Sequence, residues 1–171
     1  MNSSTKGSKG RKRQNRGKLE NKNVKYINTK LQGFLLLDAI TETEEEKIVG
    51  ARRFFDEAPW MCAESLAQLG AFHVRFLTGF KKHAFLLKIN RCLMPYQGEL
   101  RGRYLLRGTL LSRSSAAFSY ELNAGRGNQQ EITGIFLYAA VDYDDVFKKE
   151  LLQEHYLRLF SCLRNVTEEE F

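Results

Sequence analysis

The chain has 171 residues, of which 43% are hydrophobic, and this length and composition indicate one folded domain with its own core. Its three cysteines, Cys62, Cys92 and Cys162, are widely spaced and include no C-x-x-C pair. A disulfide framework and a zinc site are therefore not expected, and a reducing, cytoplasmic setting fits best. The sequence also predicts no cofactor.

The net charge of +7 is concentrated at the N-terminus. Residues 1–25 hold nine Lys and Arg and one acid, whereas the other residues hold 18 basic and 19 acidic side chains. Because residues 1–25 lack any apolar run, we predict that they form a disordered basic tail. Such a tail can bind nucleic acid, but no aromatic residues alternate with its charges, so a solvated extension is the simpler interpretation. Neither a secretory signal nor a membrane-spanning run is expected.

Two strands are predicted at residues 34–41 and 47–55, joined by an acidic turn at residues 44–46. The apolar segment that follows predicts a helix over residues 59–77. Pro59 lies in the first turn of this helix, where its missing N–H costs no hydrogen bond. Gly79 lies just past the helix end, as a C-cap glycine does.

The rest of the chain is expected to be strands and one more helix. Residues 85–94, 98–124 and 130–141 show strand-like runs, with turn signals at 96–98 and 124–128. Residues 142–163 predict an amphipathic helix from the helical spacing of their apolar side chains. This order predicts an α+β fold in which one antiparallel sheet curls around an apolar helix. The expected organisation is therefore a tail (1–25), a sheet-and-helix domain (26–141) and a C-terminal amphipathic helix with its tail (142–171).

The predicted central helix carries a carboxylate, Glu64, and an amide, Gln68, among apolar neighbours. Residues four apart lie on the same helix face. A carboxylate is seldom buried without a partner or a chemical role, so this pair is a candidate site. The structural alternative is that the two side chains line a polar stripe or satisfy a buried backbone group.

Three segments resemble, in the same order, the 3-hydroxyacyl-[acyl carrier protein] dehydratases of the hotdog fold. Residues 35–38 match a leucine-rich strand that ends in Asp, and residues 64–68 match the Glu-Ala-Leu-Ala-Gln sequence of the family's central helix. The third segment is similar to a Pro–x–x–Gly–Asp–x–Leu turn: its Pro, Gly and acidic positions are matched by Pro95, Gly98 and Glu99, and Leu100 follows directly. The resemblance covers residues 32–141 and implies a hotdog fold, with the sheet wrapped around one long central helix.

The resemblance also implies a site and its partners. Glu64 would lie at the mouth of an acyl tunnel between two protomers, with Gln68 as a second polar group beside it. Backbone N–H groups at the helix start would hold the thioester carbonyl. Trp60, Met61 and Cys62 would lie near the tunnel mouth and bind substrate. The implied partners are acyl-CoA or acyl carrier protein in fatty acid or polyketide metabolism, handled by a homodimer or higher oligomer.

One part of the family pattern is missing. The family's catalytic His lies in a Gly-, Phe- and Pro-rich loop before the helix, whereas this chain runs through "RRFFDEAPW" directly into the helix. The chain therefore resembles a divergent member of the family, and His73, His83 and His155 are not obvious substitutes. His73 fits a core or interface position better than the role of a base.

Several functions stay open. Glu64 could act as acid and base in a dehydratase-like lyase or a thioesterase. Cys62, near the helix start, is a minor candidate nucleophile, because the helix dipole lowers a thiol's pKa. Alternatively, the protein is catalytically degenerate and binds an acyl chain or a protein partner, and a weaker alternative is nucleic-acid contact through the basic tail. An acidic carrier protein could bind to a rim of basic side chains near the tunnel. Ordinary solvated surface is an equally good interpretation of the six residues that could form this rim: Arg52, Arg53, Lys81, Lys82, Arg101 and Arg103.

Overall fold

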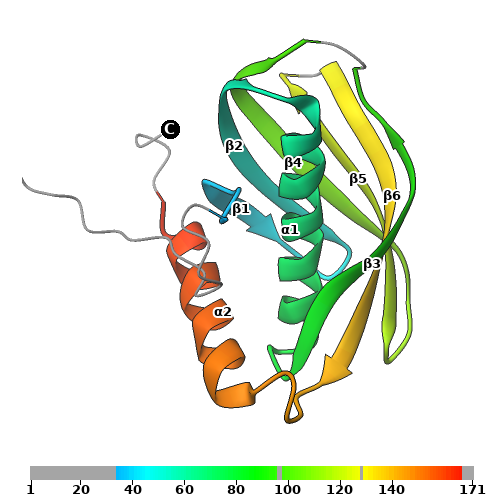
Figure 1. Cartoon of the computed structure of the whole chain (residues 1–171), viewed down its shortest axis with the longest axis vertical. Coiled ribbons are helices and arrows are strands. Elements are labelled where there is room, and N and C mark those ends of the chain that lie inside the picture. Colours follow the sequence, from blue (N-terminus) through cyan, green and yellow to red (C-terminus); the bar gives the residue numbers. More distant parts are fainter. Residues whose placement is uncertain (1–33, 96–97, 128, 167–171) are drawn as a thin grey trace, which may run out of the picture.

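A six-stranded antiparallel sheet curves around one central helix (Figure 1). The computed structural model describes residues 34–95, 98–127 and 129–166, so the predicted basic tail lies outside the described residues. The elements are β1 (Ala39–Thr43), β2 (Lys47–Glu57), α1 (Pro59–Leu77), β3 (Lys82–Leu93), β4 (Leu100–Arg113), β5 (Ala117–Arg126), β6 (Gln129–Asp142) and α2 (Lys149–Arg164). The strand order β1-β2-β4-β5-β6-β3 leaves β1 and β3 at the two edges of the sheet. The predicted α+β architecture is confirmed.

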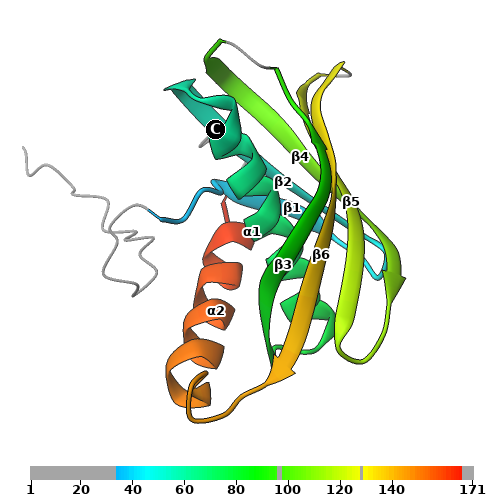
Figure 2. The same ribbon diagram turned by 45° about the vertical axis from the view of Figure 1, so that its right-hand side comes forward.

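The central helix α1 has the predicted bounds, residues 59–77. Pro59 occupies its first turn, and Gly79 follows its end with a φ of +59°, a conformation that glycine adopts without steric cost. The amide of Phe80 donates to the carbonyl of Arg75 at 2.7 Å and closes this end of the helix. Figure 2 shows α1 lying in the concave face of the sheet, where its apolar side chains form the core.

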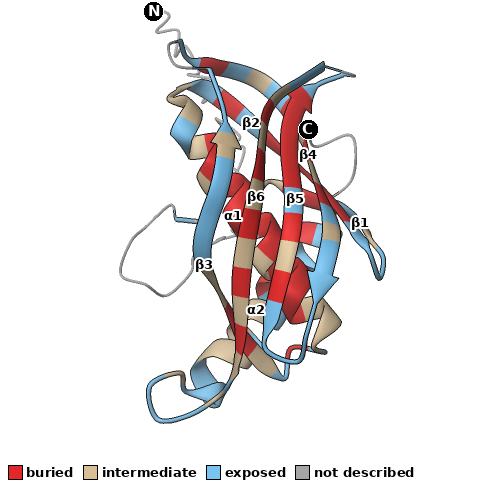
Figure 3. Cartoon of the chain, turned by 90° about the vertical axis from the view of Figure 1, so that its right-hand side faces the viewer, coloured by how far each residue is buried: buried red, intermediate tan, exposed pale blue. Residues whose placement is uncertain are grey.

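Figure 3 shows how burial follows the strands: residues that face α1 are buried, and much of the edge strand β3 is exposed. The alternation is clearest on β4 and β6, as expected for a sheet with one face on the core. None of the helices in the described part of the chain is long and apolar enough to span a membrane.

The structure corrects several predicted boundaries. The run predicted at 98–124 is two strands, β4 and β5, separated by residues 114–116, and β3 begins at Lys82 and not at residue 85. The first strand begins at Ala39 and not at residue 34, because the Gln68 side chain bonds the backbone of the preceding segment. The turn predicted at 124–128 is shorter, since β5 continues to Arg126. The last helix begins at Lys149 and not at residue 142, because the Asp144 carboxylate accepts the amides of residues 146 and 147 and holds a turn there.

Helix α2 packs beside α1, on the side away from the sheet (Figures 1 and 2). Its buried apolar residues are Leu159, Phe160 and Leu163. The Phe160 ring lies 6.2 Å from the ring of Phe72, 5.9 Å from that of Phe76 and 5.3 Å from that of Phe80, measured between centroids. The C-terminal helix therefore extends the core through an aromatic cluster.

Candidate functional site

Glu64 and Gln68 lie half-buried on α1, as a hydrogen-bonded pair. The Gln68 Nε2 group donates to Glu64 Oε1 at 3.3 Å and to the carbonyl of Phe34 at 2.8 Å. Its Oε1 atom accepts the amide of Leu36 at 2.9 Å. Gln68 therefore hydrogen-bonds the backbone of residues 34–36 as a neighbouring strand would. This is the structural role that the sequence analysis named as the alternative to a catalytic site.

Replacing Gln68 by leucine is expected to release the segment that precedes β1. The change removes both bonds to this segment and leaves the Phe34 carbonyl and the Leu36 amide without them, which should lower the free energy of unfolding by about 2 kcal/mol. Urea unfolding measures the loss, and amide exchange at Leu36 should become faster. Gln130→Leu, at an exposed position of β6, is the control. Unchanged Leu36 exchange in the Gln68 variant would contradict this role.

The start of α1 has no capping side chain and one free backbone donor. Its N-cap, Ala58, makes no side-chain cap, and no acidic residue lies in the first turn. The two acids just before the helix point elsewhere: Glu57 pairs with Arg52 at 2.7 Å, and Asp56 lies 3.5 Å from Arg101. Pro59 has no N–H, and the Met61 amide donates to the carbonyl of Ala58 at 2.9 Å, so among the first helical residues the Trp60 N–H is left for solvent or a ligand. Arg52 is buried in its ion pair, so it is not part of an exposed basic rim.

The three predicted substrate-binding residues at this helix start differ in exposure. Trp60 is 62% exposed, Met61 is half-buried and Cys62 is fully buried. Burial raises the pKa of the Cys62 thiol to about 12, so the thiol stays protonated at neutral pH. The expectation that the helix dipole lowers this pKa is wrong, because desolvation outweighs it. Trp60 and Met61 remain candidates for contact with a ligand.

A carboxylate that the sequence did not single out, Glu131, points into the fold. It is an extra residue of β6 in a bulge, because Ala124 pairs with Ile132 whereas Gly125 pairs with Gln130. The Tyr104 hydroxyl donates to one Glu131 oxygen at 2.6 Å. A carboxylate in an otherwise apolar strand, just after the turn near Gly127, is the sequence signal that could have identified it.

The Glu131 carboxylate is held in its ionised form. Burial alone would raise its pKa, but the hydrogen bonds from Tyr104 and Arg126 outweigh burial and lower it. Arg126 donates through Nε at 2.8 Å, and its guanidinium lies 5.5 Å from the centroid of the Tyr104 ring. With both oxygens engaged, Glu131 fits a structural ion pair better than an acid–base group.

None of the three histidines lies in the position that the resemblance assigns to a catalytic base. His73 is fully buried and shares a hydrogen bond with the carbonyl of Glu44 at 2.7 Å. Burial lowers the pKa of its imidazole, which fits the expected core position. His83 on β3 and His155 on α2 lie where these elements meet the C-terminal end of α1. Among the described residues, no group of His, Cys, Asp and Glu could hold a metal ion.

His83 should make stability depend on pH. Burial, and secondarily the charge of Arg75, lowers its pKa from 6.5 to about 4. The unfolded chain then binds more protons than the folded chain between these values, so stability is complete above about pH 6.5 and falls as the pH drops towards 4, by about 2 kcal/mol. Urea unfolding at several pH values measures this slope. His83→Phe, which keeps the stack on Phe147, should reduce it, and an unchanged slope would contradict the assignment.

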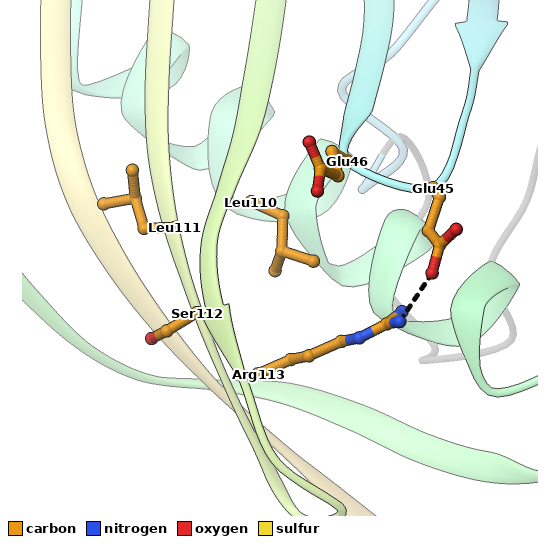
Figure 4. Close-up of a pocket in the computed structure, with 6 residues that line it drawn as sticks. All are labelled: Glu45, Glu46, Leu110, Leu111, Ser112 and Arg113. Carbon is orange, nitrogen blue, oxygen red and sulfur yellow. Dashed lines mark hydrogen bonds and ion pairs between the residues drawn. The ribbon is translucent and has the colours of Figure 1, made fainter.

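A separate surface pocket of about 170 Å³ lies between the β1–β2 turn and the end of β4 (Figure 4). Glu45 and Arg113 face each other across it, with 2.6 Å between the Arg113 Nη2 and Glu45 Oε1 atoms. No residue of the predicted site lines this pocket.

Comparison with known proteins identifies the fold. No protein-family model and no curated protein matches the sequence. Among solved structures, the dehydratase heterocomplex ApeI:P from Xenorhabdus doucetiae is 13% identical with a TM-score of 0.56, over 67% of this chain and 86% of that one. A putative thioesterase from Lactococcus lactis is 16% identical with a TM-score of 0.53, over 63% and 95% of the two chains. The chain has the hotdog fold.

A further solved structure is similar over much of its length. A conserved protein from Pseudomonas aeruginosa is 9% identical with a TM-score of 0.57, over 70% of this chain and 99% of its own. The neighbours include both thioesterases and a dehydratase, so they show the fold and do not single out the dehydratase family. They cover 60–70% of this chain, so part of the chain has no counterpart in them.

Proposed function

We propose that this hotdog protein acts on acyl thioesters, carried by coenzyme A or by acyl carrier protein, with Glu64 as the acid–base group. The observation that carries the proposal is the environment of the Glu64 carboxylate. It is half-buried, its hydrogen-bond partner is the neutral Gln68, and no cation pairs with it among the described residues. A structural carboxylate in such a place is normally paired with a cation.

The reaction that fits one such carboxylate is hydrolysis. The free Trp60 N–H at the start of α1 would polarise the thioester carbonyl, and Glu64 would take a proton from a water molecule as it attacks. The C–S bond then breaks, and the proton passes from Glu64 to the leaving thiolate, which gives a carboxylic acid and a free thiol. Dehydration of a 3-hydroxyacyl thioester is the second candidate reaction, since hotdog neighbours include a dehydratase.

We also propose a homodimer formed through the edge strand β3. This strand presents exposed apolar side chains, Leu87, Ile89 and Leu93, along an unpaired edge. An open edge of this kind favours association with another strand. Light scattering should give twice the chain mass, and Ile89→Lys should shift it to that of one chain. A monomeric wild-type protein would contradict the dimer.

The function is tested by offering purified protein a panel of thioesters. Short, medium and aromatic acyl-CoAs and 3-hydroxyacyl-CoAs would be followed by free thiol and by enoyl absorbance, and the same acyl groups would then be offered on acyl carrier protein. Wild type should turn over at least one substrate, and Glu64→Ala should abolish it. Glu121→Ala, at an exposed position of β5, is the control and should keep full activity. Thiol release indicates hydrolysis, and enoyl formation indicates dehydration.

One observation favours a non-catalytic alternative. Both ends of the Gln68 amide are bonded to the backbone before β1, so this residue has a structural role whether or not chemistry occurs. A degenerate protein would bind an acyl chain or a protein partner without converting it. Absence of turnover on both carriers, together with saturable binding of an acyl-CoA, would favour this alternative.

A further inference from the structure

Arg75, in the last turn of α1, is a buried charge that lacks a counterion in the described chain. The residue is 4% exposed. Its Nη2 group donates to the carbonyl of Ala84 at 2.5 Å, and its Cζ atom lies 3.7 Å from the centroid of the Tyr156 ring. Its Nε atom is buried without a hydrogen-bond partner, and no described carboxylate forms an ion pair with it. The partial negative charge at the C-terminal end of α1 offsets only part of this charge.

Two histidines add buried nitrogen atoms beside Arg75. The Nδ1 atom of His83, from β3, and the Nε2 atom of His155, from α2, have no hydrogen-bond partner. Their rings lie 6.0 Å and 5.4 Å from the Tyr156 ring, the same ring that the Arg75 guanidinium covers. Three elements thus bring three unpartnered nitrogen atoms around one tyrosine, at the junction of α1, β3 and α2 (Figure 1).

The charges that reach the two histidine rings are all cationic. Burial is the main cause of the lowered pKa of both imidazoles, and the charge of Arg75 lowers both further. Arg158 adds to the effect on His155. The hydroxyl of Tyr143, which faces His83, donates to a backbone carbonyl at 3.3 Å. The junction therefore has an excess of positive charge and of unpartnered nitrogen atoms.

We propose that the junction of α1, β3 and α2 binds one small oxyanion, a carboxylate or a phosphate, through Arg75 and the unpartnered nitrogens of His83 and His155. The oxyanion supplies the acceptor that the described residues do not give to the Nε atom of Arg75, which is the unpartnered donor of its guanidinium. It contacts α1 and α2 together, so its binding stabilises the docked position of α2. The site is independent of Glu64, which lies eleven residues earlier on α1, about 16 Å away along the helix axis.

The first test is thermal unfolding of the full chain at pH 7 and constant ionic strength, with chloride replaced stepwise by phosphate or by acetate. The wild-type Tm should rise by about 5 °C at saturation in at least one series. Arg75→Met should lose this response and keep only the general effect of the salt, whereas Arg91→Met, at an exposed position of β3, should respond as wild type does. A response to phosphate alone or to acetate alone identifies the ligand. Identical responses of wild type and Arg75→Met would overturn the proposal.

A second test needs no variant and holds even if Arg75→Met fails to fold. The chain has three histidines, and ¹⁵N NMR of the wild-type imidazoles reports each of them. Adding the anion should move the signals of His83 and His155, while His73, which bonds the carbonyl of Glu44, stays unchanged as an internal control. Unmoved His83 and His155 signals at saturating phosphate and acetate would reject the site.

Discussion

Gly70→Ala should lower the free energy of unfolding by about 3 kcal/mol, although alanine is the better helix former by about 1 kcal/mol. A Cβ atom at residue 70 would overlap the Tyr138 hydroxyl and lie 2.8 Å from the Cε2 atom of its ring. Tyr138 cannot move away freely, because it is fully buried and its hydroxyl donates to the carbonyl of Ala67 at 3.0 Å. Gly70 therefore sets how closely α1 approaches β6. Urea unfolding measures the loss.

Two further variants separate this overlap from other effects of glycine. Gly79→Ala places a Cβ in open space, so it should lower the free energy of unfolding only by the strain of the positive φ, about 1 kcal/mol. Tyr138→Leu removes the hydroxyl and part of the ring, so Gly70→Ala should cost much less when added to that variant. Additive costs of Gly70→Ala and Tyr138→Leu would mean that their contact does not limit the packing of α1.

Phe160→Ala is expected to lower the free energy of unfolding by a similar amount and to loosen α2 in particular. The side chain is 9% exposed and contacts three phenylalanine rings of the cluster described above. Truncating a buried phenylalanine typically costs about 3 to 5 kcal/mol, and here α1 and the sheet remain packed without it. Hydrogen exchange should therefore increase over residues 149–164 first. Urea unfolding then measures how far the change lowers the free energy of unfolding of the whole domain.

The control for this change is Leu157→Ala, on the same helix at a side chain that is 41% exposed. It should alter stability by about 0.5 kcal/mol or less. If Phe160→Ala leaves exchange over α2 as slow as in wild type, the aromatic cluster does not hold this helix.

The sequence predicted the central helix well because its signals are local. Pro59, the apolar run and Gly79 act within one segment, and the observed bounds follow them. The boundaries that failed depend on side chains distant from the segment or on turn chemistry. No local pattern reveals that Gln68 bonds the chain 32 and 34 residues earlier. The turn that Asp144 holds is local, but acidic residues also suit the start of a helix, so the pattern predicts a helix through it.

The candidate site was predictable in part. Glu64 and Gln68 could be singled out as polar residues on an apolar helix, and the structure brings them together. The deep burial of Cys62 could not be read from the sequence, because it depends on how the sheet covers the helix start. Glu131 and Arg75 were missed for the same reason. A single charged residue in an amphipathic segment is normally assigned to the surface, and only the tertiary contacts show that these two are enclosed.

The central claim is that Glu64 acts chemically, and Glu64→Gln tests it most directly. Glutamine keeps an oxygen that can accept the hydrogen bond from Gln68, but it cannot take up a proton at neutral pH. On the best substrate of the panel, kcat should fall by about 100-fold or more, while the free energy of unfolding stays within about 0.5 kcal/mol of wild type. Wild-type turnover in this variant would contradict the claim and leave Glu64 a structural partner of Gln68.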